Sequence, residues 1–236
     1  MIDGIPPILR EWCNDDLIAK DNREALVARL LITKAHDTVV NSLSPEFYSP
    51  TYSTPIRLTD FLVALVGEAH AKAVFDALPD NVPDPTKLID SPLGNAKLNF
   101  THWAQAKGDC AVTDEAAWIG LARNVGWECL DKQTGVDLIT PLLLWDEDGK
   151  STLSRYNVSA VLWQIRGRSG PRTVGLDAEK LRFFTRGSND MVGAQRINSR
   201  PYLTIILNLC GVPLDYSSKA NMDRPYVPAR YSRISF

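Results

Sequence analysis

The sequence predicts an α/β protein with a small mixed central sheet flanked by helices, preceded by an N-terminal helical region. Apolar residues recur at helical spacing through the first half of the chain, and short apolar runs of β type follow from about residue 127. We therefore expect a helical region over residues 1–110 and an α/β core over residues 111–236. The 236 residues, 44% of them hydrophobic and 23% charged, suffice to bury a sizeable core.

Capping residues and helix breakers divide the first half into four expected helices. Asp21 followed by Glu24 is a capping-box signature, Pro79 stops the second helix, and Thr113 can cap the fourth. The expected helices span about residues 21–36, 60–78, 95–106 and 114–124.

Four apolar runs in the second half predict strands. They cover about residues 127–130, 136–145, 158–166 and 202–209. Residues 146–150 have the composition of a turn and predict a solvated hairpin tip between the second and third runs. Pro141 lies inside the second run and predicts a bulge, because proline removes one donor from the ladder.

The cysteines and histidines show no spacing typical of a disulfide framework or a metal site. No two cysteines form a CxxC pair, and no two histidines form an HxxxH or HExxH pattern. We interpret the cysteines as buried thiols in a reducing compartment. The chain starts without a basic head and apolar run, and no run is long enough for a membrane span, so we expect an intracellular protein, cytoplasmic or nuclear.

Charge is divided unevenly along the chain. Residues 1–149 carry 12 Lys and Arg against 23 Asp and Glu, a net charge of −11. Residues 150–236 carry 14 against 5, a net charge of +9. Two interpretations stay open: the halves attract each other in the folded protein, or the second half presents an anion-binding face.

Polar residues interrupt the ends of the second and third expected strands. Asp137 starts one, and Gln164 and Arg166 end the other. In an antiparallel hairpin the positions of opposed residues have a constant sum, here about 301 to 303, which sets Asp137 across from Gln164 or Arg166 on one face. Two explanations stay open: an Asp137–Arg166 ion pair that locks the hairpin, or a site of nuclease type.

The order of these elements resembles a known nuclease core. The expected order is similar to the pattern of the PD-(D/E)xK, or restriction endonuclease-like, superfamily. It consists of a helix, a short strand, a strand beginning GVD (135–137), a hairpin, and a strand ending QIR (164–166). The Gln variant resembles Mrr-type restriction endonucleases. Most of the chain also resembles a family of uncharacterised proteins of mushroom-forming fungi, whose third strand ends in QxK or QxKxR. This second resemblance rests on DFLVALVGE, FTHW, RNVGWECLDKQTGVDLITPLLL, SAVLWQIRGR and RPYLTIILNL.

The resemblance implies roles for four residues. Asp137 would be the metal-binding acid, Gln164 stands where Glu is usual, and Arg166 stands where Lys is usual. Glu115, in the preceding helix, matches the extra acid of some members. The implied cofactor is Mg²⁺, but a single sure carboxylate is a poor ligand set for that ion, so we expect weak or absent metal-dependent cleavage.

Basic residues that follow the hairpin suit contact with a phosphate backbone, although an ordinary charged surface has the same composition. They include Arg168, Arg172, Lys180 and Arg182. The leading hypothesis is a nucleic-acid-binding protein of nuclease fold that cleaves weakly or not at all. The alternative is a protein-interaction or structural module that has lost the site. A third hypothesis is an active nuclease with Gln and Arg in unusual places.

Overall fold

The computed structural model describes residues 20–43, 54–79, 84–107, 113–129, 136–144, 152–155, 157–166, 200–209 and 230–235. The helices are α2 (Lys20–Leu43), α3 (Leu58–Val66), α4 (Glu68–Phe75) and α5 (Asp114–Arg123), with a 3₁₀ turn η1 at Leu88–Asp90. The strands are β1 (Ile56–Arg57), β2 (Lys97–Leu98), β3 (His102–Gln105), β4 (Val125–Glu128), β5 (Leu138–Leu143), β6 (Val158–Arg166), β7 (Tyr202–Asn208) and β8 (Arg230–Ser235). None of these helices is long and apolar enough to cross a bilayer.

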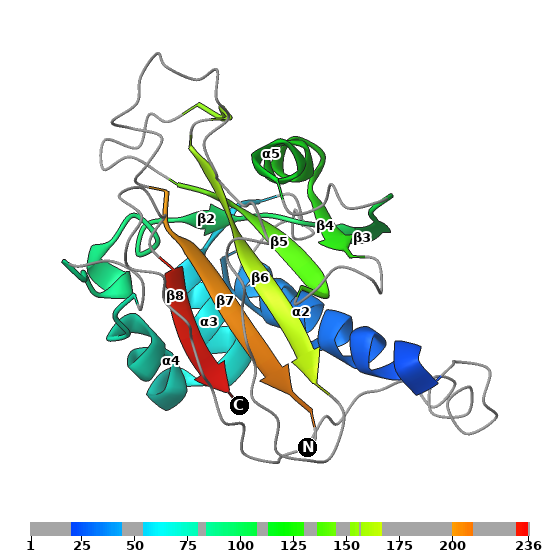
Figure 1. Ribbon diagram of the computed structural model, residues 1–236, viewed down its shortest axis with the longest axis horizontal. Helices are drawn as coiled ribbons and strands as arrows, with labels where there is room; N and C mark the ends of the chain where they lie inside the picture. Colours follow the sequence, from blue (N-terminus) through cyan, green and yellow to red (C-terminus); the bar gives the residue numbers. More distant parts are fainter. Residues whose placement is uncertain are drawn as a thin grey trace.

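The strands of the described residues form one mixed sheet (Figure 1). Its main path runs β1-β2-β5-β6-β7-β8, while β4 also pairs with β5 and β3 pairs with β4. β4, β5 and β6 are antiparallel neighbours, and β6, β7 and β8 are parallel neighbours. The mixed α/β class is thus confirmed, but the described residues contribute eight strands to the sheet, of which the four expected ones are β4 to β7.

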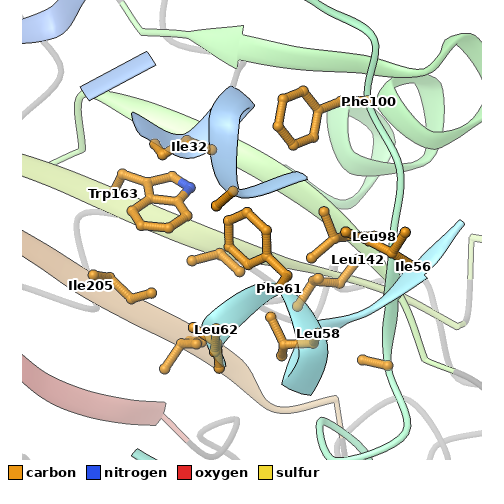
Figure 2. Close-up of a cluster of buried hydrophobic side chains, with 14 of the residues drawn as sticks. Ile32, Ile56, Leu58, Phe61, Leu62, Leu98, Phe100, Leu142, Trp163 and Ile205 are labelled. Carbon is orange, nitrogen blue, oxygen red and sulfur yellow. The ribbon is translucent and has the colours of Figure 1, made fainter. Parts of the chain in front are cut away.

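The central strand β6 is covered on both faces. On one face, Trp163 and Ile165 join a core formed with α2 and α3, and the ring of Phe61 meets the ring of Trp163 edge-on at 6.1 Å between centroids (Figure 2). On the other face, Leu162 joins a second core with Ala117 of α5. Residues 158–165 are all buried, which is why apolar side chains lie on both faces of β6 instead of alternating with exposed polar ones.

The region before residue 110 is not purely helical. The helix expected over residues 95–106 is wrong, because β2 and β3 lie there. β2 pairs with Leu142 and Leu143 of β5, β3 runs parallel to β4, and Phe100 between them is buried in the core. Since β1 to β3 join the same sheet as β5 and β6, the main core crosses the boundary expected at residue 110.

The helix ends follow local backbone chemistry. The Thr113 cap is confirmed: its hydroxyl oxygen accepts the N–H of Ala116 at 3.1 Å. α5 ends at Arg123, close to the expected end at about residue 124, and its C-cap Asn124 has a left-handed φ of 55°. The expected helix 60–78 is divided by Gly67, whose φ of 80° suits glycine and separates α3 from α4.

Pro141 does not cause a bulge. The β5–β6 register runs through it without a shift, with Pro141 opposite Ala160. On the other edge of β5, β4 pairs with Leu138 and Ile139, and β2 pairs with residues 142 and 143. Pro141 therefore lies where the partner strand changes from β4 to β2, a position that needs no donor from it.

The shared core predicts that α3 unfolds together with the sheet. Phe61→Ala should lower the free energy of unfolding by about 3–5 kcal/mol, because it leaves a cavity beside Trp163. Val63→Ala on the same helix, where Val63 is 37% exposed, should cost about 0.5 kcal/mol. Urea unfolding followed by tryptophan fluorescence and by circular dichroism tests this. Two separate transitions, with only the helical signal shifted by Phe61→Ala, would contradict a shared core.

Candidate functional site

The β5–β6 register brings Asp137 to the end of β6. Opposed positions sum to 301 along the pairing, with Leu138 opposite Trp163, so Asp137 comes next to Gln164. The N–H of Asp137 donates to the carbonyl of Trp163 at 2.8 Å, and its carboxylate Oδ2 accepts the N–H of Ile165 at 2.5 Å. The register agrees with the sequence prediction, and the carboxylate contacts the backbone between Gln164 and Arg166.

Gln164 is the most deeply buried polar group at this end of β6. It is 1% exposed, and within the described part of the chain its Oε1 has no hydrogen-bond partner. It alternates with Trp163 and so leaves β6 on the face that α5 covers, as Leu162 does. A buried acceptor without a donor costs about 1–3 kcal/mol, so its presence calls for an explanation.

Arg166 ends β6 at the same edge. It is half-buried, and its carbonyl accepts the N–H of Leu209 at 2.8 Å. Alternation along β6 puts its side chain on the face of Gln164. Among the ion pairs of the described residues, none joins Arg166 to Asp137, so the predicted ion pair that would lock the hairpin is not found there.

Cys129 is a neighbour of Asp137 that sequence reasoning missed. It follows β4, and its N–H donates to the carbonyl of Asp137 at 2.8 Å, which continues the β4–β5 register. The thiol is buried, and burial, together with the negative charges of Asp137 and Glu128, raises the pKa of Cys129 to about 12. Applying the constant-sum rule to β4 and β5 would have set Cys129 beside Asp137.

Glu115 lies at the opposite end of the hairpin. Its carboxylate meets the guanidinium of Arg155 at 3.4 Å, and both side chains are well exposed. Arg155 precedes the first residue of β6, whereas Arg166 is the last. The structure therefore does not bring Glu115 to Asp137, because α5 directs its N-terminus towards the start of β6 rather than its end.

The four basic residues expected to contact nucleic acid lie outside the described residues, as does the turn at 146–150. They are Arg168, Arg172, Lys180 and Arg182. Their placement relative to Asp137 stays a prediction.

The residues at this edge do not suit Mg²⁺. Beside the carboxylate of Asp137 lie the neutral amide of Gln164 and the thiol of Cys129, while Arg166 ends the same strand. Mg²⁺ requires hard oxygen ligands in octahedral geometry, and sulfur is a poor ligand for it. Within the residues that the structure describes, no group of three or more His, Cys, Asp or Glu side chains could hold a metal ion.

Comparisons with known proteins show no relative. The chain matches no family model, no curated protein and no solved structure. The geometry of the site is thus the basis for a functional proposal.

The backbone contact of Asp137 predicts a stability difference between two substitutions. Asp137→Ala leaves the Ile165 N–H without this acceptor and should lower the free energy of unfolding by about 1–3 kcal/mol. Asp137→Asn keeps an oxygen acceptor and should cost less. Asp76→Ala, which removes an exposed pair with Lys87, should cost clearly less than Asp137→Ala in the same urea titration, because solvent screens an exposed ion pair. An Asp137→Ala loss no larger than that of Asp76→Ala would contradict the contact.

Proposed function

We propose that this is a nucleic-acid-binding protein of nuclease fold, intracellular, whose metal-dependent phosphodiester cleavage is weak or absent. The observation that carries the proposal is the contact of the Asp137 carboxylate with the backbone of Ile165, between Gln164 and Arg166. An acid on one strand of a buried hairpin and a polar pair on the next is the arrangement that the sequence resemblance implies for a phosphodiesterase site.

The order of the elements around the site supports the proposal. α5 is followed by β4, β5 and β6, each antiparallel to the one before, and β7 then lies parallel to β6. This agrees with the helix, short strand and hairpin order that suggested a nuclease core. The helix α5 packs on the face of the sheet from which Gln164 projects.

The side chains at the site favour binding over cleavage. Generation of hydroxide at a phosphate needs a firmly held cation, and the donors around Asp137 do not suit Mg²⁺. Arg166 keeps the positive charge of the usual lysine and can bind a phosphate oxygen through its fork of donors. It does not replace a compact ammonium, and its charge opposes a neighbouring dication.

The charge of the second half of the chain supports nucleic acid as the ligand. Residues 150–236 have a net charge of +9, which includes the arginines directly after β6. A set of this size would release counterions from a phosphate backbone on binding.

A protein-interaction or structural module is the second candidate function, and burial favours it. Gln164 is 1% exposed and Cys129 is 7% exposed, so a substrate phosphate would reach the centre of the site only after some rearrangement. Failure to bind any nucleic acid at low salt would favour this module.

Double-stranded DNA binding at low salt tests the proposal. We expect fluorescence polarisation to show binding that weakens as salt rises, because counterion release drives it. Arg168→Ala with Arg172→Ala should weaken binding to all sequences and reduce the salt slope by about 2. Lys34→Ala with Lys72→Ala, which removes two exposed charges from the acidic half, should leave affinity nearly unchanged. Absence of binding at low salt would remove DNA as a ligand.

Cleavage assays test the assignment of a weakened site. The natural protein should cut DNA little or not at all with Mg²⁺ or Mn²⁺, because its ligand set is poor. Gln164→Glu with Arg166→Lys restores an ExK pair and should raise the cleavage rate, and adding Asp137→Asn should abolish that gain. Robust metal-dependent cutting by the natural protein, lost in Asp137→Asn, would show that its site is intact.

A further inference from the structure

One face of α2 carries a row of polar side chains that contacts the sheet. Arg29 donates to the carboxylate of Glu128 in β4 at 2.8 Å. One turn further along, the hydroxyl of Thr33 accepts the Nε1–H of Trp103 in β3 at 3.1 Å. His36 follows on the same face, since residues three and four apart on a helix are neighbours. α2 therefore docks on the sheet through polar contacts as well as through its apolar side.

His36 is the buried member of this row. Its side chain is 1% exposed, and its ring lies against the ring of Phe100, with 4.8 Å between the centroids. Nδ1 lies 3.4 Å from Oδ1 of Asp37, and Nε2 has no hydrogen-bond partner among the described residues. The side chain of Asn99 lies close enough to favour the charged ring, although no hydrogen bond of good geometry joins it to Nε2. A titratable ring is thus enclosed where α2 meets the connection between β2 and β3.

Two opposing effects act on the charge of this ring. Burial is the larger one and lowers the pKa of His36 below its ordinary value of 6.5, because a charged imidazole would lose its hydration. The carboxylate of Asp37 and the amide of Asn99 favour the charged form, but they only partly offset the burial. His36 is therefore neutral at pH 7 while α2 is docked.

The other charges around the ring are more open to water. The titratable side chains on the elements that surround His36 are all partly or fully exposed, so solvent screens them. They are Arg57 of β1, Asp60 of α3, Lys97 of β2, His102 of β3, Glu128 of β4 and Arg166 of β6. The charge that acts on the ring is that of Asp37, its neighbour on α2.

We propose that His36 makes the docking of α2 sensitive to pH, so that α2 is held on the β2–β3 connection near neutral pH and loosens in mildly acidic solution. When α2 separates from Asn99 and Phe100, the ring returns to water and takes up a proton with its ordinary affinity. The docked ring binds that proton less well, so acid favours the loosened state. Below about pH 6.5, one proton shifts this equilibrium by at most about tenfold per pH unit, until the docked ring also titrates.

Asn99 connects this contact with the other helical layer. Its Nδ2 donates to Oδ1 of Asn124 at 2.7 Å, and Asn124 is the left-handed C-cap of α5. The pH-sensitive contact therefore lies on a connection that reaches both α2 and the end of α5. The proposal does not depend on nucleic-acid binding, so its tests use the free protein and leave the proposed function untouched.

A histidine NMR titration tests the docked ring directly. The Cε1–H signal that disappears in His36→Phe should titrate below about pH 6.5 in the folded protein, because the enclosed ring resists the charge. His102→Gln, which removes an exposed histidine, should leave that signal and its midpoint unchanged. A midpoint for His36 at or above pH 6.5 would overturn the proposal.

Urea unfolding at pH 6.5 and pH 5.5 tests the consequence for the fold. The natural protein should lose more stability on acidification than His36→Phe, which keeps an aromatic ring against Phe100 but cannot titrate. The difference should be up to about tenfold in the folding equilibrium constant, the most that one proton allows over one pH unit. His36→Gln replaces the Phe variant if the larger ring prevents folding, and His70→Gln is the control for an exposed histidine. Equal losses in the natural protein and in the His36 variant would overturn the proposal.

Amide hydrogen exchange locates the loosening. After correction for intrinsic rates, the amides of residues 28–40 in α2 should lose more protection between pH 6.5 and pH 5.5 than those of β6, because the helix loosens before the sheet opens. The same comparison in His36→Phe should show no such excess. An equal loss of protection in α2 and β6 of the natural protein would show that acid acts on the whole fold and not on the docking of α2.

Discussion

The burial of β6 on both faces is the constraint on which the rest of the structure depends. Residues 158–165 are all buried, which requires one layer of helices on each side of the sheet. α2 and α3 form one layer and α5 contributes to the other. The N-terminal helices are therefore needed to cover the hairpin, and Phe61 against Trp163 joins the two halves of the chain.

The same burial explains why part of the fold could be predicted from the sequence. β6 and β7 are long and apolar, and their bounds were nearly those of the predicted runs. β1, β2 and β3 have two to four residues, too few for a periodicity, and they form because β5 and β4 offer them hydrogen-bond partners. β8 was missed for another reason: its six residues include two arginines and two serines, so they form no apolar run, and the strand depends on its parallel pairing with β7.

The candidate site was partly predictable for a different reason. Polar groups in apolar strands are costly, so Asp137 and Gln164 were conspicuous, and a constant-sum rule was enough to bring them together. Cys129 was not conspicuous, because a buried thiol in an apolar segment is ordinary. Glu115 was misplaced because chain order does not determine which end of a helix meets which end of a strand. The pairing of β4 with β5 places Cys129 beside Asp137, and the direction in which α5 packs places Glu115 away from it.

Gln164 connects the stability of the fold with its chemistry. A domain is stable by about 5–15 kcal/mol, so a buried amide oxygen without a donor is a sizeable loss for one side chain. The core around Trp163 is extensive enough to tolerate it, and that core is formed on the opposite face of the same strand. The apolar residues on one face of β6 thus pack the strand against α2 and α3. The polar side chains of Gln164 and Arg166 lie on the other face, at the end of the strand. A leucine at position 164 would satisfy the core alone, whereas the glutamine adds a buried amide oxygen that has no hydrogen-bond donor among the described residues.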